Sequence, residues 1–278
     1  MGIDVKAIKA LQERTGAGIM DCKKALTEAN GDEEKAIDIL REKGIAKAAA
    51  KAGRVAAEGL AEIGISEDGK TAVVAEINCE TDFVSGSPKF HEIVDEIIKV
   101  LLEKQPATLD EAKEDTKEIF TDAVVAMREN FVFRRYAILH AEDGQAFGKY
   151  IHAGGKIAAL VLLSKDMGEE IDKGLAMTVA SAAPTYLSLA NVPEEDKARE
   201  QAIAEKEVAS DPKLANKPEN VKATIAQRKV AARLGDNCLG SKPYALDMSG
   251  KLTVDQLCKE KGFSVLSFVR YAVGEASK

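Results

Sequence analysis

The stretch that decides the fold is residues 71–84, which read TAVVAEINCETDFV. Its first half, residues 71–77, is an apolar run of the length expected for a buried strand. A carboxylate and a bulky ring, Asp82 and Phe83, then stand side by side at the exit of that strand, and the Ser-Gly-Ser-Pro sequence at 85–88 breaks regular structure. We therefore expect Phe83 on a loop, where it must pack either back into this chain or against a partner.

The sequence on both sides of this stretch predicts a small antiparallel sheet covered by helix. Asp68-Gly69 separates the alternating runs 59–66 and 71–77, which is typical of a β-hairpin. Pro88 begins a long amphipathic helix, helical segments continue to about residue 130, and residues 131–141 predict a third strand. These elements form a first α+β subdomain, residues 55–143.

The same order of elements recurs further along the chain. Predicted strands at 145–153 and 156–164 flank the turn Gly154-Gly155, and a helix follows at 168–183. After an interruption, strands are predicted at 244–248 and 265–273, with a helix at 253–261 between them. Residues 144–191 and 235–278 thus form a second, related α+β subdomain.

Two helical pieces complete the organisation. Residues 1–54 predict a compact three-helix domain in which Val5, Ile8 and Leu11 share one helical face, and Gly44 ends the third helix before a short helix or linker at 45–52. Residues 192–234 predict a charged helical hairpin inserted in the second subdomain. The predicted fold class is α+β: three N-terminal helices, two related subdomains of small antiparallel sheet plus helices, and the inserted hairpin.

Charge and cysteine content exclude several classes of protein. The net charge is -7, which argues against a general nucleic-acid binder, although residues 1–54 carry +2 and could seek an acidic surface on a partner. The four cysteines have neither metal-type spacing nor the density of a disulfide scaffold, so we expect reduced and mostly buried thiols. With no targeting signal and no apolar run of about 20 residues, the expected location is the cytoplasm, away from membranes.

Residues that could carry chemistry are few. The histidines at 91, 140 and 152 lack metal-type spacing, so no metal or cofactor is expected. Glu80 and Asp82 would share one side of an extended segment, the least that acid/base work or a hard cation needs, but no nucleophile or third ligand accompanies them. A basic stripe, defined as Lys43, Lys47, Lys51 and Arg54, is either a solvated face or a contact to an acidic helix of a partner.

Two segments carry a resemblance to a known family. Residues 11–26, which include RTGAGIMDCKKAL, and residues 76–85, EINCETDFVS, resemble the two signature segments of the elongation factor Ts family. The resemblance implies a translation elongation factor of protein biosynthesis that exchanges GDP for GTP on elongation factor Tu without covalent chemistry. It also implies a partner bound in its GDP-loaded and nucleotide-free forms, and an N-terminal unit like a ubiquitin-associated domain.

The same resemblance assigns roles to individual residues. Asp82 and Phe83, with Thr81 and Val84 beside them, would enter a crevice in the partner's GTP-binding domain and disturb its magnesium and phosphate site. A second set in the helical unit would grip another helix of that domain: Arg14, Ile19, Met20, Lys23 and Lys51. The second subdomain would hold a more distant domain of the partner, and the inserted hairpin would support a homodimer. Departures from the family pattern fall at Gly86 and at Thr178, where some members place a partner-facing His.

Two other functions remain as alternatives at this point. The helical unit could bind polypeptides in the manner of ubiquitin-associated domains, with the α+β part as a scaffold. Glu80 and Asp82 could serve a carboxylate-dependent hydrolase, which would require metal binding.

Overall fold

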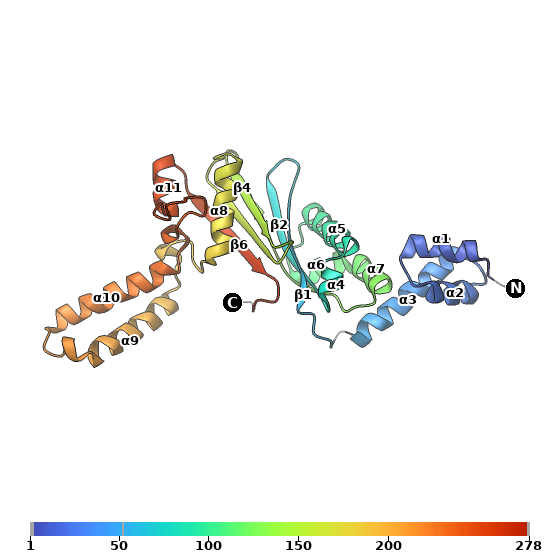
Figure 1. Ribbon diagram of the computed structural model, residues 1–278, viewed down its shortest axis with the longest axis horizontal. Helices are drawn as coiled ribbons and strands as arrows, with labels where there is room; N and C mark the ends of the chain where they lie inside the picture. The colour runs from blue at the N-terminus through green and yellow to red at the C-terminus, as the bar shows by residue number, and fades with distance from the viewer. Residues whose placement is uncertain (1–2, 52, 277–278) are drawn as a thin grey trace. The chain divides into compact units, whose positions relative to one another are not determined.

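The computed structural model describes residues 3–51 and 53–276, with the backbone alone for Lys47, Ala48 and Ala49. It divides into two compact units. The first holds Met1–His140, Ile151–Ala158 and Tyr271–Lys278, and the second holds Ala141–Tyr150 and Ala159–Arg270. The predicted α+β class is confirmed: three N-terminal helices precede two small antiparallel three-stranded sheets with their helices (Figure 1).

The N-terminal helices are α1 (Val5–Thr15), α2 (Ile19–Glu28) and α3 (Glu33–Lys51). The Asp4 carboxylate accepts the Lys6 N–H at 3.0 Å and so caps the first helix. The buried side chains of the three helices form one small core: Ile8, Leu11, Ala17, Cys22, Ala25, Leu26, Ala29, Ala36 and Leu40. Val5, which shares a helical face with Ile8 and Leu11, is 66% exposed. It occupies the first turn, where the helix has not yet reached that core.

The prediction that Gly44 ends the third helix is wrong. Helix α3 continues through Gly44 to Lys51, so that the predicted linker is part of one long helix. A Cβ atom at position 44 would lie 2.4 Å from Cγ2 of Val125. Glycine therefore serves close packing against the helix that carries Val125, and its lower helix propensity is offset by that contact.

The first sheet consists of β1 (Glu58–Ile65), β2 (Thr71–Cys79) and β3 (Val132–His140), in the order β1-β2-β3 with antiparallel pairing. Every residue of the central strand β2 is buried. Three helices lie between residue 87 and β3: α5 (Pro88–Lys104), α6 (Leu109–Asp115) and α7 (Lys117–Met127). Helix α5 lies against the first sheet (Figure 1). Its predicted apolar stripe forms the centre of the hydrophobic core of this subdomain: Phe90, Ile93, Val94, Ile97, Ile98 and Leu101.

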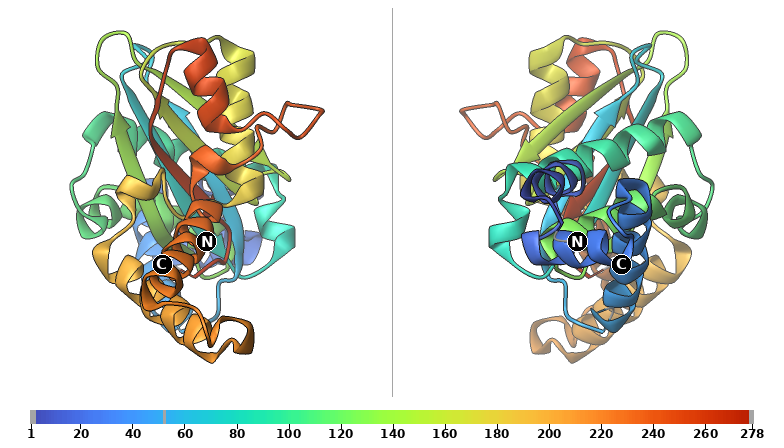
Figure 2. Two further views of the ribbon diagram at one scale, coloured as in Figure 1. Left: turned by 90° about the vertical axis from the view of Figure 1, so that its left-hand side faces the viewer. Right: turned by 90° about the vertical axis from the view of Figure 1, so that its right-hand side faces the viewer.

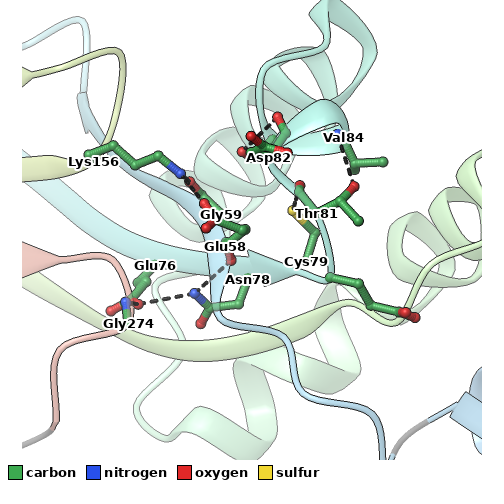
Figure 3. A network of polar contacts seen from close by, with 12 residues as sticks. Glu58, Gly59, Glu76, Asn78, Cys79, Thr81, Asp82, Val84, Lys156 and Gly274 are labelled. Carbon is green, nitrogen blue, oxygen red and sulfur yellow. Dashed lines mark hydrogen bonds and ion pairs between the residues drawn. The ribbon is translucent and has the colours of Figure 1, made fainter.

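A buried carboxylate lies within β2. Glu76 has no exposed side-chain surface, and its oxygens lie 2.7 Å from Nε of Arg135 and 3.7 Å from Nε of Arg134. The Asn78 side-chain amide and the Gly274 N–H donate to the same carboxylate at 3.2 and 2.8 Å (Figure 3). Glu76 pairs with Arg135 across the sheet and Ile77 with Phe133, so Arg134 is the extra residue of a β-bulge.

The second sheet consists of β4 (Ala146–His152), β5 (Ile157–Leu163) and β6 (Val265–Ala272), in that order. Helix α8 (Glu169–Ala182) follows β5, and α11 (Val254–Lys261) precedes β6. Between them the predicted hairpin is present as α9 (Glu194–Ser210) and α10 (Glu219–Asp236), which lie side by side (Figures 1 and 2). Short 3-10 turns occupy Leu189–Asn191, Pro212–Leu214 and Leu239–Ser241.

The strand predicted at residues 244–248 is absent. The Asp247 carboxylate accepts the N–H groups of Ser249, Lys251 and Leu252 at 3.1, 2.9 and 2.7 Å, and this turn replaces a strand ladder. These bonds, with that from Leu252 the strongest influence, lower the pKa of Asp247 to about 2.

Thr178, the departure noted in the sequence, is fully buried in the second unit. Its hydroxyl accepts the Ala245 N–H at 2.9 Å and donates to the Gly174 carbonyl at 2.9 Å. This side chain therefore holds a loop onto its own helix and is unavailable for contact with a partner.

We predict that Glu76→Ala lowers the free energy of unfolding by about 3–5 kcal/mol, because it leaves the Arg135 guanidinium half-buried without its counter-charge. Chemical denaturation followed by circular dichroism measures the loss. Exposed Glu67, in the β1–β2 turn, provides the control: Glu67→Ala should change stability by less than about 0.5 kcal/mol. Equal losses in both variants would contradict a structural role for the Glu76 ion pair.

Candidate partner-binding site

The tip, defined as residues 81–84, follows β2 directly and is helical. Thr81 is the N-cap of the four-residue helix α4 (Asp82–Ser85), and its hydroxyl oxygen accepts the Val84 N–H at 3.4 Å. Ser87 then caps α5 by accepting the Phe90 N–H at 3.3 Å. The expected loop is therefore a cap, one helical turn and a second cap, all local hydrogen bonds that short polar side chains favour.

The four predicted tip residues divide into two outward and two inward positions. Phe83 is 87% exposed, and the Asp82 side chain beside it is also exposed. Val84 packs partly against the apolar core below the sheet, and Thr81 is half-buried with both sides of its hydroxyl engaged (Figure 3). The alternative in which Phe83 packs back into its own unit is thus wrong, and the tip presents an acid and an aromatic ring to solvent.

Glu129 fixes the base of the tip. One carboxylate oxygen accepts the N–H groups of Glu80 and Thr81 at 2.9 and 3.1 Å, and the other accepts the Thr81 hydroxyl at 2.5 Å. Hydrogen bonds to a charged acceptor contribute about 1.5–3 kcal/mol each, more than neutral ones. The backbone leading into α4 is therefore held by a residue that lies far away in the sequence.

Glu80 returns the contact. Its carboxylate accepts the Asn130 N–H at 2.7 Å and lies 3.3 Å from a guanidinium nitrogen of Arg54. The Asn130 N–H, and after it the Arg54 guanidinium, lower the pKa of Glu80. Glu80 and Asp82 do not share one side of an extended segment, because Asp82 begins a helix. The geometry on which a carboxylate-dependent hydrolase would rest is thus not formed.

The second predicted surface lies at the start of α2. Ile19 and Met20 are 56% and 62% exposed, and Lys23 lies exposed one turn further along. Arg14 contacts Glu33 and Glu34 at 2.7 and 2.9 Å, which raises its pKa through the hydrogen bond to Glu33 first. Two adjacent large apolar side chains are unusual on a solvated helix and are typical of an interface.

The described side chains of the basic stripe contact other residues of this chain. Lys43 pairs with Glu28 at 2.7 Å, Arg54 contacts Glu80, and the Lys51 ammonium donates to the Arg128 carbonyl. The side chain of Lys47 lies outside the described residues. Lys51, expected from the resemblance to contact a partner, is thus placed at the end of α7, whose last carbonyls a cation stabilises.

Sequence reasoning missed Glu129 and its neighbours on either side. They lie between a helix and a strand, where three polar residues are ordinary, and neither periodicity nor spacing distinguishes them. Only the contact between distant parts of the chain makes their role visible. Within residues 3–51 and 53–276, no group of three His, Cys, Asp or Glu side chains could hold a metal ion, and none of the helices described there is long and apolar enough to cross a membrane.

The fold and its exposed side chains define a class of protein that acts by binding another protein. Asp82 and Phe83 are exposed on the helical turn α4, and the apolar pair Ile19 and Met20 is exposed on a separate helix, α2. The model of the Elongation factor TS family matches residues 80–275, which is more than half of the chain. The chain belongs to the elongation factor Ts family, which promotes nucleotide exchange on elongation factor Tu in translation elongation and does no covalent chemistry.

The extent of the match separates the two signatures. It begins at Glu80 and so takes in the tip, strand β3 and the second sheet, whereas β1 and β2 lie before it. The signature at residues 11–26 lies outside the matched residues and therefore remains a resemblance.

We predict that Cys79, at the end of β2, resists alkylation in the native chain. Burial raises the pKa of its thiol to about 12. At pH 8 the reactive thiolate is then scarcer than in an unstructured peptide by a factor on the order of 10³. Mass spectrometry after iodoacetamide treatment, with the urea-unfolded chain as the control, measures the difference. Rapid native labelling would mean that the exit of β2 opens to solvent.

Proposed function

We propose that the chain accelerates GDP release from elongation factor Tu by inserting Asp82 and Phe83 into the partner's GTP-binding domain, where they disturb the magnesium and phosphate site. The observation that carries this proposal is the 87% exposure of Phe83 on a turn whose base is fixed by Glu129. A ring on a mobile loop would lose backbone conformational entropy on binding, whereas the backbone that leads to this ring is already held.

The tip alone is too weak for the task. As an illustration, loosening bound nucleotide by ~10⁴-fold requires about 5.5 kcal/mol of differential binding. Burial of one Phe side chain contributes about 1.5–3 kcal/mol. Other surfaces must therefore supply binding energy that holds the tip in place. By thermodynamic linkage, bound nucleotide lowers the affinity of elongation factor Tu for this chain by the same factor.

The helical unit, residues 1–54, is the proposed anchor. Ile19 and Met20 supply apolar area, Lys23 and Arg14 supply charge around it, and Lys51 acts from within by securing the end of α3. Thr81 and Val84 likewise support the tip from its inner side. Each of these residues has a defined task, but only the exposed ones would touch the partner.

The remaining parts of the chain have proposed roles that rest on the family. The first subdomain, residues 55–143, carries the tip, and the second, residues 144–191 and 235–278, would bind a more distant domain of the partner. The hairpin at 192–234 would support a homodimer. No nucleic acid, cofactor or membrane is required by this scheme, and the site of action would be the cytoplasm, where elongation factor Tu works.

We predict that Phe83→Ala and Asp82→Ala each slow the release of fluorescent GDP from elongation factor Tu at saturating factor, by about tenfold or more for Phe83, because about 1.5–3 kcal/mol of burial is lost in the exchanging complex. Stopped-flow fluorescence over a range of factor concentrations separates the maximal rate from the half-saturating concentration. Val55, which is 81% exposed and lies outside both the tip and the anchor, provides Val55→Ala as a control for loss of a surface apolar side chain.

Unchanged maximal rates in both tip variants, with native circular dichroism, would refute the insertion mechanism. The matching test of the anchor is Met20→Ala, which should raise the half-saturating concentration and leave the maximal rate nearly unchanged. Binding of unrelated polypeptides that Met20→Ala abolishes, without any acceleration of GDP release by the native chain, would instead favour the polypeptide-binding alternative.

A further inference from the structure

The turn between α7 and β3 contacts both surfaces proposed above. We call residues 128–130 the junction. Glu129 binds the backbone at the base of the tip, and the Asn130 N–H donates to the Glu80 carboxylate, so two adjacent junction residues face the two residues that precede α4. Asn130 is buried, and its side-chain amide donates to the Arg54 carbonyl at 2.9 Å.

The first junction residue reaches in the other direction, towards the helical unit. A guanidinium nitrogen of Arg128 lies 3.0 Å from the Asp21 carboxylate, and Asp21 directly follows Met20 on α2. The Arg128 carbonyl accepts from the Lys51 ammonium at the end of α3. One residue thus contacts two of the three N-terminal helices, while its sequence neighbour contacts the tip.

A glycine in the helical unit makes room for this contact. A Cβ atom on Gly18, the N-cap of α2, would lie 1.9 Å from a guanidinium nitrogen of Arg128. Two further glycines also approach α7: a Cβ atom on Gly16 would lie 3.0 Å from Cβ of Ala126, and one on Gly44 would lie 2.4 Å from Cγ2 of Val125. The helical unit therefore seats on the C-terminal turn of α7 through positions without side chains.

We infer that the junction positions the tip relative to the anchor, so that Glu129 and Arg128 are positioning residues for nucleotide exchange. The inference rests on the proposed function and goes beyond it in assigning a role to residues that need not touch the partner. Glu129 fixes the direction in which Phe83 projects, and Arg128 fixes the α2 surface against the same turn. Binding at Ile19 and Met20 thereby keeps the tip in place on the partner, because both surfaces are attached to the same turn.

The first test asks whether Glu129 acts through the tip. Glu129→Gln keeps the size of the side chain but removes its charge and replaces one acceptor oxygen with a donor amide. We expect the maximal rate of fluorescent GDP release to fall by about tenfold, because loss of orientation costs rate more than affinity. In the Phe83→Ala background the same substitution should have less than about a twofold effect, because the group it positions is gone. Glu103→Gln, an exposed glutamate on α5, is the control.

The outcomes of this cycle separate the inference from the proposed function. Equal losses in the native and Phe83→Ala backgrounds, or no loss in the native background, would overturn the positioning role of Glu129. No effect of Phe83→Ala itself would overturn the proposed function. In that case amide hydrogen exchange tests whether Glu129 holds the base of the tip. Glu129→Gln should accelerate exchange at the Glu80 and Thr81 amides, and unaltered exchange would overturn the positioning role of Glu129.

The second test addresses the link to the anchor. Arg128→Gln and Asp21→Asn should each lower the maximal rate by about fivefold, as expected for the loss of one partly exposed ion pair. The double variant should lose no more than either single one, because both remove the same contact. Additive losses, or a change in half-saturating concentration alone, would show that Arg128 or Asp21 contacts the partner directly and would overturn the link.

Discussion

The Glu76 carboxylate holds the first unit together at its centre. A charge in the middle of a fully buried strand is costly to desolvate and is stable only when its partners are complete. Here the partners come from three places: Arg134 and Arg135 on β3, Asn78 on β2 itself, and the Gly274 N–H near the end of the described chain. The bulge at Arg134 allows consecutive arginines, which would face opposite sides of a regular strand, to approach one carboxylate.

This constraint also determines where the tip stands. With Glu76 fixed opposite Arg135, the register of β2 against β3 is set, and Asn78 pairs with Val132 at the far end of the ladder. The exit of β2 therefore lies beside the residues that precede β3, Glu129 and Asn130. The two pairs of residues are then joined by reciprocal hydrogen bonds: the Thr81 N–H donates to the Glu129 carboxylate, and the Asn130 N–H donates to the Glu80 carboxylate. The exposed Phe83 ring thus follows directly on backbone that hydrogen bonds to charged side chains hold in place at Glu80 and Thr81.

Local pattern predicted most of the fold but not the long-range contacts. The apolar run at 71–77, the Asp68-Gly69 turn and the stripe on α5 each carry their signal within one window, and the structure has the strand, the turn and the helix there. The prediction that the third helix ends at Gly44 was wrong because glycine usually indicates the end of a helix, and the sequence alone does not reveal its packing partner Val125. The strand predicted at 244–248 does not form because the Asp247 carboxylate accepts three backbone N–H groups in a turn. At the site, Phe83 could be predicted and Glu129 could not, since only the fold brings the two together.

The glycines at 16 and 18 show how one short segment can satisfy two demands. In sequence they are part of the segment that resembles a family signature, and Ile19 and Met20 beside them are exposed as a binding surface would be. In the structure a Cβ atom on Gly16 would lie 3.0 Å from Cβ of Ala126, and one on Gly18 would displace the Arg128 guanidinium. Gly16 also has a φ of 64°, which favours glycine independently. Contacts within the chain thus favour glycine at 16 and 18, whereas the exposed Ile19 and Met20 belong to the partner surface proposed above. A segment under both constraints tolerates few substitutions, because the inward-facing Gly18 and the exposed Ile19 are adjacent in the sequence.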